Sequence, residues 1–233
     1  MISKIAIFSD AHGNPLGFEV CLRAARQLGA ESFFFLGDAV GYMPGELAVM
    51  TLLAQNDVSP IRGNHEAMLL RSAPQPVERE AVYRLDAARS RLTAEDIGRI
   101  ATWPLQRALD VGGRKVLLVH GSPTDPLQGY VYPDSDLSGF TPNYDAIFMG
   151  HTHRPFVRAV ESTLFVNVGS VGLPRDDGSL AAFAVYDVTA NRAEIIRVRL
   201  DMAKVFNAYG ASLHPSVREC FARRAPDIVG RVV

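Results

Sequence analysis

Histidine and acidic residues gather in five short segments that each follow an apolar run. The segments are Ser9-Asp10-Ala11-His12, Gly37-Asp38, Arg62-Gly63-Asn64-His65-Glu66, His120-Gly121 and Gly150-His151-Thr152-His153. Five of the six histidines in the chain lie in them, and four of the five segments contain a glycine. Neutral imidazole is the commonest side-chain metal ligand, and a mixture of imidazole, carboxylate and amide donors suits a transition metal. The pattern therefore predicts a metal site.

A single segment would be weak evidence for such a site. The pair His151 and His153 could aim two rings at one point, because residues two apart face the same way in a strand. Histidines and aspartates also cap strand ends and satisfy buried backbone groups, which is the simpler explanation for any one segment. Five segments together favour the metal site, since a purely structural role would leave five imidazoles at the edge of a core without a purpose.

Apolar runs and helical spacing predict the elements that position these segments. In the first third of the chain we expect strands at 4–8 and 32–36 and a short strand ending near Ile61. Helices are expected at 15–28, with Asn14 as N-cap before Pro15, and at 45–55. In α/β sheets ligands gather at the carboxyl ends of the strands, so segments far apart in sequence can converge there.

The rest of the chain divides into a helical part, a β-rich part and a C-terminal part. Helical spacing predicts a helix at 78–92 and a capped helix start at 93–96. A hairpin of 105–109 with 115–119 follows, and then strands at 146–149, 164–168, 181–188 and 193–200. Beyond Asp201 we expect short helices at 203–208 and 216–224, followed by a loose tail.

Composition excludes several classes of protein. The 24 Lys and Arg residues balance 25 Asp and Glu residues, so the chain lacks the basic excess of nucleic-acid-binding proteins. Cys21 and Cys220 stand far apart, which predicts neither a disulfide framework nor a thiolate zinc site. The N-terminal apolar run is too short for a signal-peptide core, and no stretch approaches the roughly 20 apolar residues of a membrane span. We expect a cytoplasmic protein with no membrane or nucleic-acid partner, whose C-terminal helices also allow a homo-oligomer.

In this order, the five segments resemble the pattern of the calcineurin-like metallophosphoesterases: Asp-x-His, Gly-Asp, Gly-Asn-His-Asp/Glu, His and Gly-His-x-His. The resemblance spans residues 5–187 and is closest to the compact bacterial and archaeal branch, whose Gly-Asp-x-Val-Gly-Tyr and Gly-Ser-Val-Gly-x-Pro-Arg stretches occur here around Asp38 and Ser170. It implies an α/β fold that is a four-layer α/β/β/α sandwich of two mixed β-sheets flanked by helices. The metallophosphoesterase domain would occupy 1–200 with a helical cap at about 66–103, and 201–233 would be a C-terminal helical extension packed on it.

The resemblance also implies a centre of two divalent transition-metal ions, with manganese as the first expectation and iron, zinc or nickel as alternatives. The implied ligands are Asp10, His12 and His153 on one ion, Asn64, His120 and His151 on the other, and Asp38 as the bridge between them. Two such ions about 3.5–4 Å apart can activate a water molecule and bind the attacking and leaving oxygens of an in-line displacement. His65, next to Asn64, is then the candidate general acid that protonates the leaving alkoxide.

One departure from the family concerns the segment after Asp38. In the related serine/threonine protein phosphatases it continues Gly-Asp-x-x-Asp-Arg-Gly, where the later aspartate orients the catalytic histidine and the arginine grips phosphate. Gly41 and Tyr42 stand at those positions here, so Glu66 becomes the candidate for orienting His65. The candidate substrate-binding residues in or near the segments are Arg62, Tyr42, Arg154 and Arg175, and Tyr42, Tyr130 and Tyr132 could also form an aromatic wall for a base.

The leading function is hydrolysis of a phosphodiester or phosphomonoester bond in a small phosphoester or nucleotide substrate. A dinucleoside polyphosphate hydrolase and a protein phosphatase are alternatives on the same site, the latter weakened by the departure at Gly41 and Tyr42. A non-catalytic scaffold resembling the retromer subunit of this fold is a different class. Such scaffolds typically lose ligands or the catalytic histidine, whereas all seven implied ligands and His65 are present here. A metal-binding regulator that dimerises through its C-terminal helices is the third class.

Overall fold

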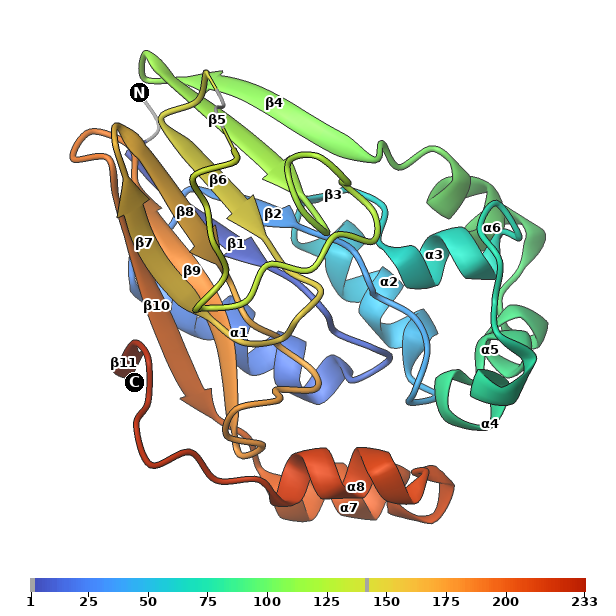
Figure 1. Ribbon diagram of the computed structural model, residues 1–233. Coiled ribbons are helices and arrows are strands. Elements are labelled where there is room, and N and C mark those ends of the chain that lie inside the picture. The colour runs from blue at the N-terminus through green and yellow to red at the C-terminus, as the bar shows by residue number, and fades with distance from the viewer. Residues whose placement is uncertain (1–2, 141–142) are drawn as a thin grey trace.

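Two β-sheets pack against each other in the computed structural model, which describes residues 3–140 and 143–233 (Figure 1). The six-stranded sheet has the order β11-β10-β9-β1-β2-β3, and the five-stranded sheet has the order β4-β5-β6-β8-β7. Each sheet contains parallel and antiparallel pairs. The predicted class is confirmed as a mixed α/β fold in which two mixed sheets are flanked by helices.

The six-stranded sheet contains the first three predicted strands, with β1 near its centre and β3 at its edge. Its members are β1 (Lys4–Phe8), β2 (Ser32–Phe35), β3 (Val58–Pro60), β9 (Leu180–Asp187), β10 (Arg192–Arg199) and β11 (Arg231–Val232). Strands β1, β2 and β3 are parallel, so their carboxyl ends lie at the same edge. This edge carries the first three of the polar segments.

The five-stranded sheet supplies the other two polar segments. It consists of β4 (Gln106–Val111), β5 (Arg114–Val119), β6 (Ala146–Met149), β7 (Phe156–Val160) and β8 (Thr163–Asn167). The predicted hairpin is confirmed as β4 and β5, joined by a turn in which Gly112 and Gly113 have φ of 56° and 77°. Strands β5, β6 and β8 are parallel, which again places their carboxyl ends together.

Apolar side chains from both sheets form the core between them. The buried residues of this layer include Ile5 and Ile7 of β1, Leu118 of β5, Phe148 of β6 and Tyr186 of β9. These strands are buried on both faces, which explains their near-continuous apolar sequences. The two sheets therefore hold their polar carboxyl ends in a fixed relation to each other.

Helices cover the outer face of the six-stranded sheet. They are α1 (Pro15–Gln27), α2 (Glu46–Gln55), α7 (Met202–Tyr209), the short η2 (Gly210–Ser212) and α8 (Pro215–Ala222). Phe18 of α1, Val205 of α7 and Phe221 of α8 are buried in one cluster with Phe8 and Phe183 of the sheet. Asn14 caps α1 as predicted, since its side chain accepts the Gly17 N–H. The outer face of the other sheet packs against the segment between β5 and β6, which contributes buried Val131 and Leu137.

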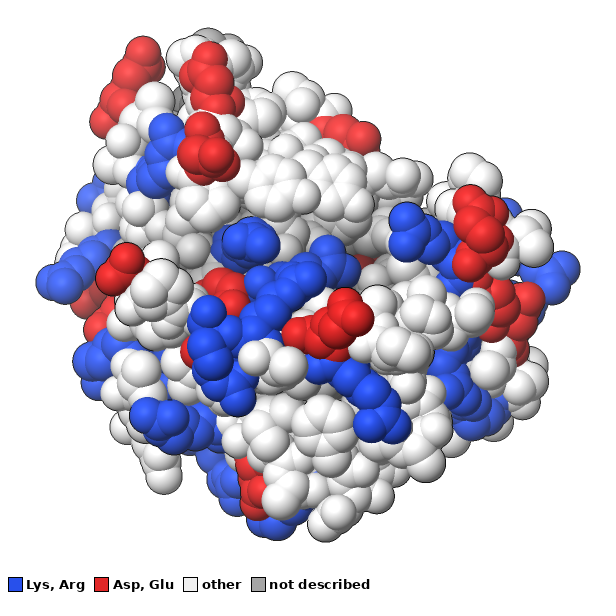
Figure 2. Space-filling model, turned by 60° about the horizontal axis from the view of Figure 1, so that its bottom comes forward, with Lys and Arg blue, Asp and Glu red and all other residues white. Residues whose placement is uncertain are grey.

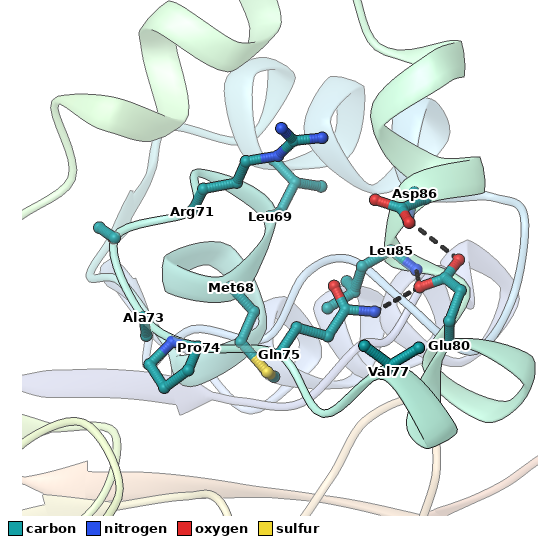
Figure 3. A pocket seen from close by; sticks show the side chains of 11 residues that line it. Met68, Leu69, Arg71, Ala73, Pro74, Gln75, Val77, Glu80, Leu85 and Asp86 are labelled. Carbon is teal, nitrogen blue, oxygen red and sulfur yellow. Dashed lines mark hydrogen bonds between the residues drawn. The ribbon is translucent and has the colours of Figure 1, made fainter.

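The helical segment after β3 contains α3 (Asn64–Leu69), η1 (Val77–Arg79), α4 (Glu80–Tyr83), α5 (Leu85–Arg91) and α6 (Ala94–Ala101). The predicted capped start is confirmed, with Thr93 as N-cap of α6. The single helix predicted at 78–92 is wrong, because Arg84 adopts a left-handed conformation with φ of 57° that separates α4 from α5. The Glu80 carboxylate stabilises this break by accepting the N–H groups of Leu85 and Asp86, at 3.0 Å each, and a bond from Gln75 (Figure 3).

Two further differences between the predicted and the observed structure concern strands. Strand β7 was not among the predicted strands, because it is a partly exposed edge strand with Arg158 in its middle and lacks a long apolar run. The loose tail predicted after α8 is wrong at its end, since Arg231 and Val232 pair in parallel with β10. Among the described residues, no helix combines the length and the apolar character needed to cross a membrane.

Candidate metal centre

The carboxyl ends of five strands bring the polar segments to one place. Asp10 and His12 follow β1, Asp38 follows β2, and Asn64 begins α3 just after β3. His120 follows β5 directly, while the His151 and His153 segment follows β6. The structure places the seven side chains that the sequence singled out as ligands around one buried centre, with His65 beside them.

One half of the centre contains Asp10, His12 and His153. The His153 Nε2 atom lies 3.3 Å from Asp10 Oδ1, and the His12 Nε2 atom lies 3.8 Å from the same oxygen. The two Nε2 atoms are 3.0 Å apart. The three donor atoms lie within 4.8 Å of one another, so a single ion can contact all three.

The other half contains Asn64, His120 and His151. The His120 Nε2 atom lies 2.9 Å from Asn64 Oδ1 and 3.1 Å from His151 Nδ1. Asp38 lies between the halves, because its Oδ2 atom is 3.5 Å from His120 Nε2 and 3.7 Å from His12 Nε2. The Asp38 carboxylate therefore lies close to donor atoms of both halves.

Backbone carbonyl groups orient three of the imidazoles. The Nδ1 atoms of His12, His120 and His153 lie 3.3, 2.8 and 2.5 Å from the carbonyl oxygens of Val40, Leu36 and Leu173 respectively. A carbonyl oxygen only accepts hydrogen bonds, so each Nδ1 must carry a proton, and with an ion bound each neutral ring would turn an unprotonated Nε2 toward it.

These donors fit a pair of cations. Unprotonated nitrogen atoms of His12 and His153 at 3.0 Å would repel each other unless a positive charge lies between them. Asp10 Oδ1 is buried and has no hydrogen-bond partner among the described residues, which leaves this oxygen as a donor atom for an ion. Imidazole, carboxylate and amide oxygen together suit first-row transition metals.

The charged groups of the centre shift one another's pKa values. Burial alone would raise the pKa of Asp10 and Asp38, but the neighbouring imidazoles outweigh burial and hold both pKa values below their usual range. Burial opposes protonation of His120 as well, yet the carboxylates of Asp38 and Asp10 raise its pKa to about 9. Both effects show that the site favours positive charge at its middle.

Strained backbone supports the ligand positions. Five of the side chains at the centre sit on left-handed backbone, with φ between 48° and 64°: Asp10, His12, Asp38, His151 and His153. Such conformations cost of order 1–3 kcal/mol each in residues other than glycine, and they persist where the surrounding structure fixes them. Ser170 helps to fix the first turn, since its Oγ donates to the Asp10 carbonyl oxygen at 2.7 Å.

Glu66 joins the loop after β2 to the start of α3 by hydrogen bonds. Its buried carboxylate accepts the N–H groups of Asp38 and Ala39 at 2.7 Å each and the N–H of Gly63 at 2.8 Å. Burial and the nearby Asp38 raise the pKa of Glu66 to about 7. The expectation that Glu66 orients the ring of His65 is therefore not met, because its oxygens are directed to backbone amides.

Aromatic rings surround His65 instead. Its ring stacks on Tyr42, with centroids 5.1 Å apart and an interplanar angle of 19°, and contacts Tyr83 at 4.8 Å and His12 at 4.7 Å. Its Nε2 atom lies 4.0 Å from Asp38 Oδ2, while its Nδ1 atom has no partner among the described residues. Burial lowers the pKa of His65 to about 4, so the ring is neutral near pH 7.

Gly41 explains how His65 fits without the aspartate of the protein phosphatases. A Cβ atom on Gly41 would lie 2.4 Å from His65 Nδ1, and the residue has φ of 91°. Any side chain at this position would collide with the ring. Tyr83 was not found from the sequence, because it lies in the helical segment far from the polar segments. The Tyr42 N–H bond to its carbonyl oxygen, 2.7 Å long, and its ring contact with His65 bring it to them.

The four candidate substrate-binding residues separate into two groups. Tyr42, Arg154 and Arg175 line a cleft of about 860 Å³ next to the metal centre, together with Thr152 and other residues. Arg62 does not line this cleft, since its Nη2 donates to the Ala101 carbonyl oxygen at 2.7 Å at the end of α6.

A model of the calcineurin-like phosphoesterase superfamily domain matches residues 4–191. The chain belongs to this superfamily. Among its relatives, an uncharacterized protein of Methanocaldococcus jannaschii is 28% identical over 222 residues, which cover 88% of this chain and 90% of the relative. Among solved structures, a metallophosphoesterase of Sphaerobacter thermophilus has a TM-score of 0.75 and 26% identity, over 95% of this chain and 99% of the other. A hypothetical protein of Pyrococcus horikoshii has a TM-score of 0.78 at 20% identity, with 94% and 97% covered.

These findings confirm the resemblance and the fold predicted from the sequence. Membership in a phosphoesterase superfamily supports a hydrolase that acts on phosphoric esters, and the His and Asp clusters of this phosphoesterase could bind metal. The matched region ends at residue 191, so β10, α7, η2, α8 and β11 lie outside it.

Proposed function

We propose that the protein hydrolyses phosphodiester or phosphomonoester bonds with the help of two divalent transition-metal ions, manganese first among them. The observation that carries this proposal is the convergence of seven donor side chains, three of them imidazoles whose Nδ1 atoms face backbone carbonyl groups. When bound, two such ions would supply an activated water molecule and neutralise charge on the phosphoryl group.

The protein side chains would bind the two ions and transfer the proton. Asp10, His12 and His153 would hold one ion, and Asn64, His120 and His151 the other, with Asp38 between both. His65 would hold a proton at Nε2 and pass it to the leaving oxygen, a role worth about 10²–10⁴-fold in rate. The pKa of about 4 leaves His65 neutral in the free site, and the negative charge of an incoming phosphoester would raise it.

A small-molecule substrate is favoured over a phosphoprotein. At Gly41 and Tyr42 the chain lacks the aspartate and arginine that protein phosphatases use, and the Tyr42 hydroxyl accepts a bond from Arg175 at 3.2 Å in their place. The cleft beside the centre has the volume of sites that hold nucleotide-sized ligands. A dinucleoside polyphosphate is therefore a second candidate substrate.

Hydrolysis of bis-p-nitrophenyl phosphate and p-nitrophenyl phosphate tests the proposal. The metal-stripped protein is assayed before and after addition of manganese, and Asp38→Asn is compared with Asp110→Asn, a change at an exposed position on β4. We expect manganese-dependent turnover that Asp38→Asn abolishes and Asp110→Asn retains, with metal analysis showing fewer than two ions in Asp38→Asn. Two bound ions without turnover of either compound would instead support the scaffold class.

A further inference from the structure

The cleft beside the metal centre extends well beyond the space that a single phosphoryl group needs. At its inner end lie Tyr42, whose ring centroid is 4.6 Å from that of His12, and Thr152, which stands between His151 and His153. From there it continues to η1, to the segment around Tyr132, and to α8. A substrate whose scissile phosphate lies at the centre would therefore extend along these walls.

Four arginines line this cleft, and each comes from a different part of the chain. Arg79 ends η1, Arg154 follows the fifth polar segment, Arg175 follows β8, and Arg223 follows α8. Two carboxylates, Asp134 and Glu219, line it as well. The cleft thus has an excess of positive groups in a chain whose net charge is −1. Figure 2 shows this face, where Lys and Arg side chains gather around the middle and a few Asp and Glu side chains lie among them.

The cleft arginines lack the carboxylate partners that some other arginines have among the described residues. Arg91, Arg114, Arg197 and Arg231 each pair with a carboxylate of the protein. Within the described part of the chain, none of the four cleft arginines lies in such a pair. Unpaired guanidinium groups in one concave site favour an anionic ligand, and their planar donor groups match phosphate oxygens.

Hydrogen bonds hold the end of α8 against the loop after β8, and this places Arg223 in the wall of the cleft. Arg223 Nη1 donates to the Arg175 carbonyl oxygen at 3.3 Å, and the Gly178 N–H donates to the Arg223 carbonyl oxygen at 3.1 Å. A Cβ atom on Gly178 would lie 2.2 Å from the Cys220 carbonyl oxygen, so this loop and α8 are in close contact. The wall of the cleft therefore includes residues outside the region that matches the superfamily.

We infer that the outer cleft is a second anion subsite, built by Arg79, Arg154, Arg175 and Arg223, that selects nucleotide substrates carrying a further phosphate besides the scissile one. The inference rests on the proposed function and adds the substrate class. Arg154 directly follows His153 and Arg175 donates to Tyr42, so both lie toward the centre, while Arg79 and Arg223 come from η1 and the end of α8.

A matched pair of substrates tests the subsite. Thymidine 5′-(p-nitrophenyl phosphate) and the same compound with a 3′-phosphate release the same leaving group and differ only in the added phosphate. We expect kcat/KM at least about fivefold higher for the 3′-phosphorylated compound. In the double variant Arg79→Gln/Arg223→Gln the ratio between the two compounds should fall to below about twofold, whereas Arg23→Gln on the exposed side of α1 should keep the original ratio.

The results separate this inference from the proposed function. Turnover of both compounds with a ratio near one, or a ratio that the double variant leaves unchanged, would overturn the subsite and leave the phosphoesterase proposal standing. If neither compound is hydrolysed, the proposed function fails, and calorimetric titration still decides the subsite. Thymidine 3′,5′-bisphosphate should then bind at least about fivefold more tightly than thymidine 5′-phosphate, and equal affinities would overturn the inference.

Discussion

Three of the four ligand histidines at the metal centre are held differently from His65, while the fourth, His151, packs on the ring of Tyr130 with centroids 4.1 Å apart. His12, His120 and His153 each direct Nδ1 to a backbone carbonyl oxygen, so the strand ends themselves fix the direction of each ring. His65 has no such bond in the described structure and is held by the rings of Tyr42 and Tyr83. Hydrogen bonds fix both the orientation and the proton position of a ligand, whereas ring packing fixes the orientation of His65 without a hydrogen bond that holds its proton at one nitrogen.

This difference matches the two tasks that we propose. A metal ligand must present one unprotonated nitrogen at all times, and a proton donor must change its protonation state during turnover. The groups that hold these rings also belong to different parts of the fold, because the carbonyl groups come from the loops after β2 and β8 and from the end of β2, while Tyr83 comes from the helical segment. Changes to the packing should therefore alter proton transfer and leave metal binding intact.

The largest expected effect is that of His65→Ala. Turnover of esters with poor leaving groups should fall by about 10²–10⁴-fold, because these esters need a proton on the departing oxygen. p-Nitrophenyl esters should lose much less activity, and both ions should remain bound. Rate measurements across a series of leaving groups, together with metal analysis, check this. Equal losses for good and poor leaving groups would contradict the role of general acid.

A smaller loss is expected for Gly41→Ala. The added methyl group would lie 2.4 Å from His65 Nδ1 and should displace the ring, lowering turnover of poor leaving groups by about 10–100-fold. Gly29→Ala is the matched control, because Gly29 also has a left-handed φ, 80° against 91°, but has no atom within 4 Å of the added Cβ. The comparison is between the kcat values of the two variants at full metal occupancy. A similar loss in both would assign the effect to backbone strain.

Changes at Tyr83 should have a still weaker effect. Tyr83→Phe keeps the ring that packs on His65 and should retain activity within about twofold, while Tyr83→Leu should lose about tenfold on poor leaving groups. Melting temperatures of the two variants, measured alongside the leaving-group series, separate ring packing from general destabilisation. Loss of activity in Tyr83→Phe would show that the hydroxyl group, and not the ring, matters.

The smallest effect concerns the stability of the metal-free protein. Burial lowers the pKa of His65 to about 4 and that of His151 to about 3, while both titrate near 6.5 in the unfolded chain. At these two groups the unfolded state therefore binds more protons between pH 6.5 and 4, and their contribution to the free energy of unfolding should fall with falling pH, by up to about 1.4 kcal/mol per pH unit for each group. His120, with its pKa raised to about 9, and Glu66, with its pKa raised to about 7, bind protons more strongly in the folded state and contribute slopes of opposite sign, His120 near pH 6.5 and Glu66 down to about pH 4.5.

Urea unfolding of the metal-free protein at several pH values measures this slope. The variant His65→Gln lacks one of the titrating groups and should show a shallower dependence between pH 6.5 and 4. An identical slope in the variant would mean that His65 is not kept neutral by burial.

The convergence of the seven donor side chains could be predicted from the sequence, because each of them follows a strong local signal. An apolar strand followed by a polar turn is visible in a single sequence, and parallel strands bring their carboxyl ends to one edge. Strand β1 was predicted with its correct bounds for this reason, as were the starts of α1 and α6. The ordered segments then identified the family.

The surroundings of His65 could not be predicted in the same way. The contact between Tyr83 and His65 depends on the left-handed Arg84 and on the bonds that Glu80 makes beyond it, neither of which has a clear local signal. Glu66 was expected to orient His65 because it is the next residue in the chain, but the helix turns its carboxylate back to the amides of the strand-end loops. Arg223 entered the cleft only through tertiary packing of α8.

The bonds of Glu66 also bear on how the protein acquires its metal. Because this carboxylate joins the loop after β2 to the start of α3, and backbone carbonyl groups orient three of the rings, the ligand geometry is built by the fold itself. A site formed in this way can load after folding is complete and can exchange one ion for another without unfolding. We therefore expect the metal content of the purified protein to follow the metals supplied during growth, so that the native ion is identified by activity with each metal and not by analysis of the isolated protein alone.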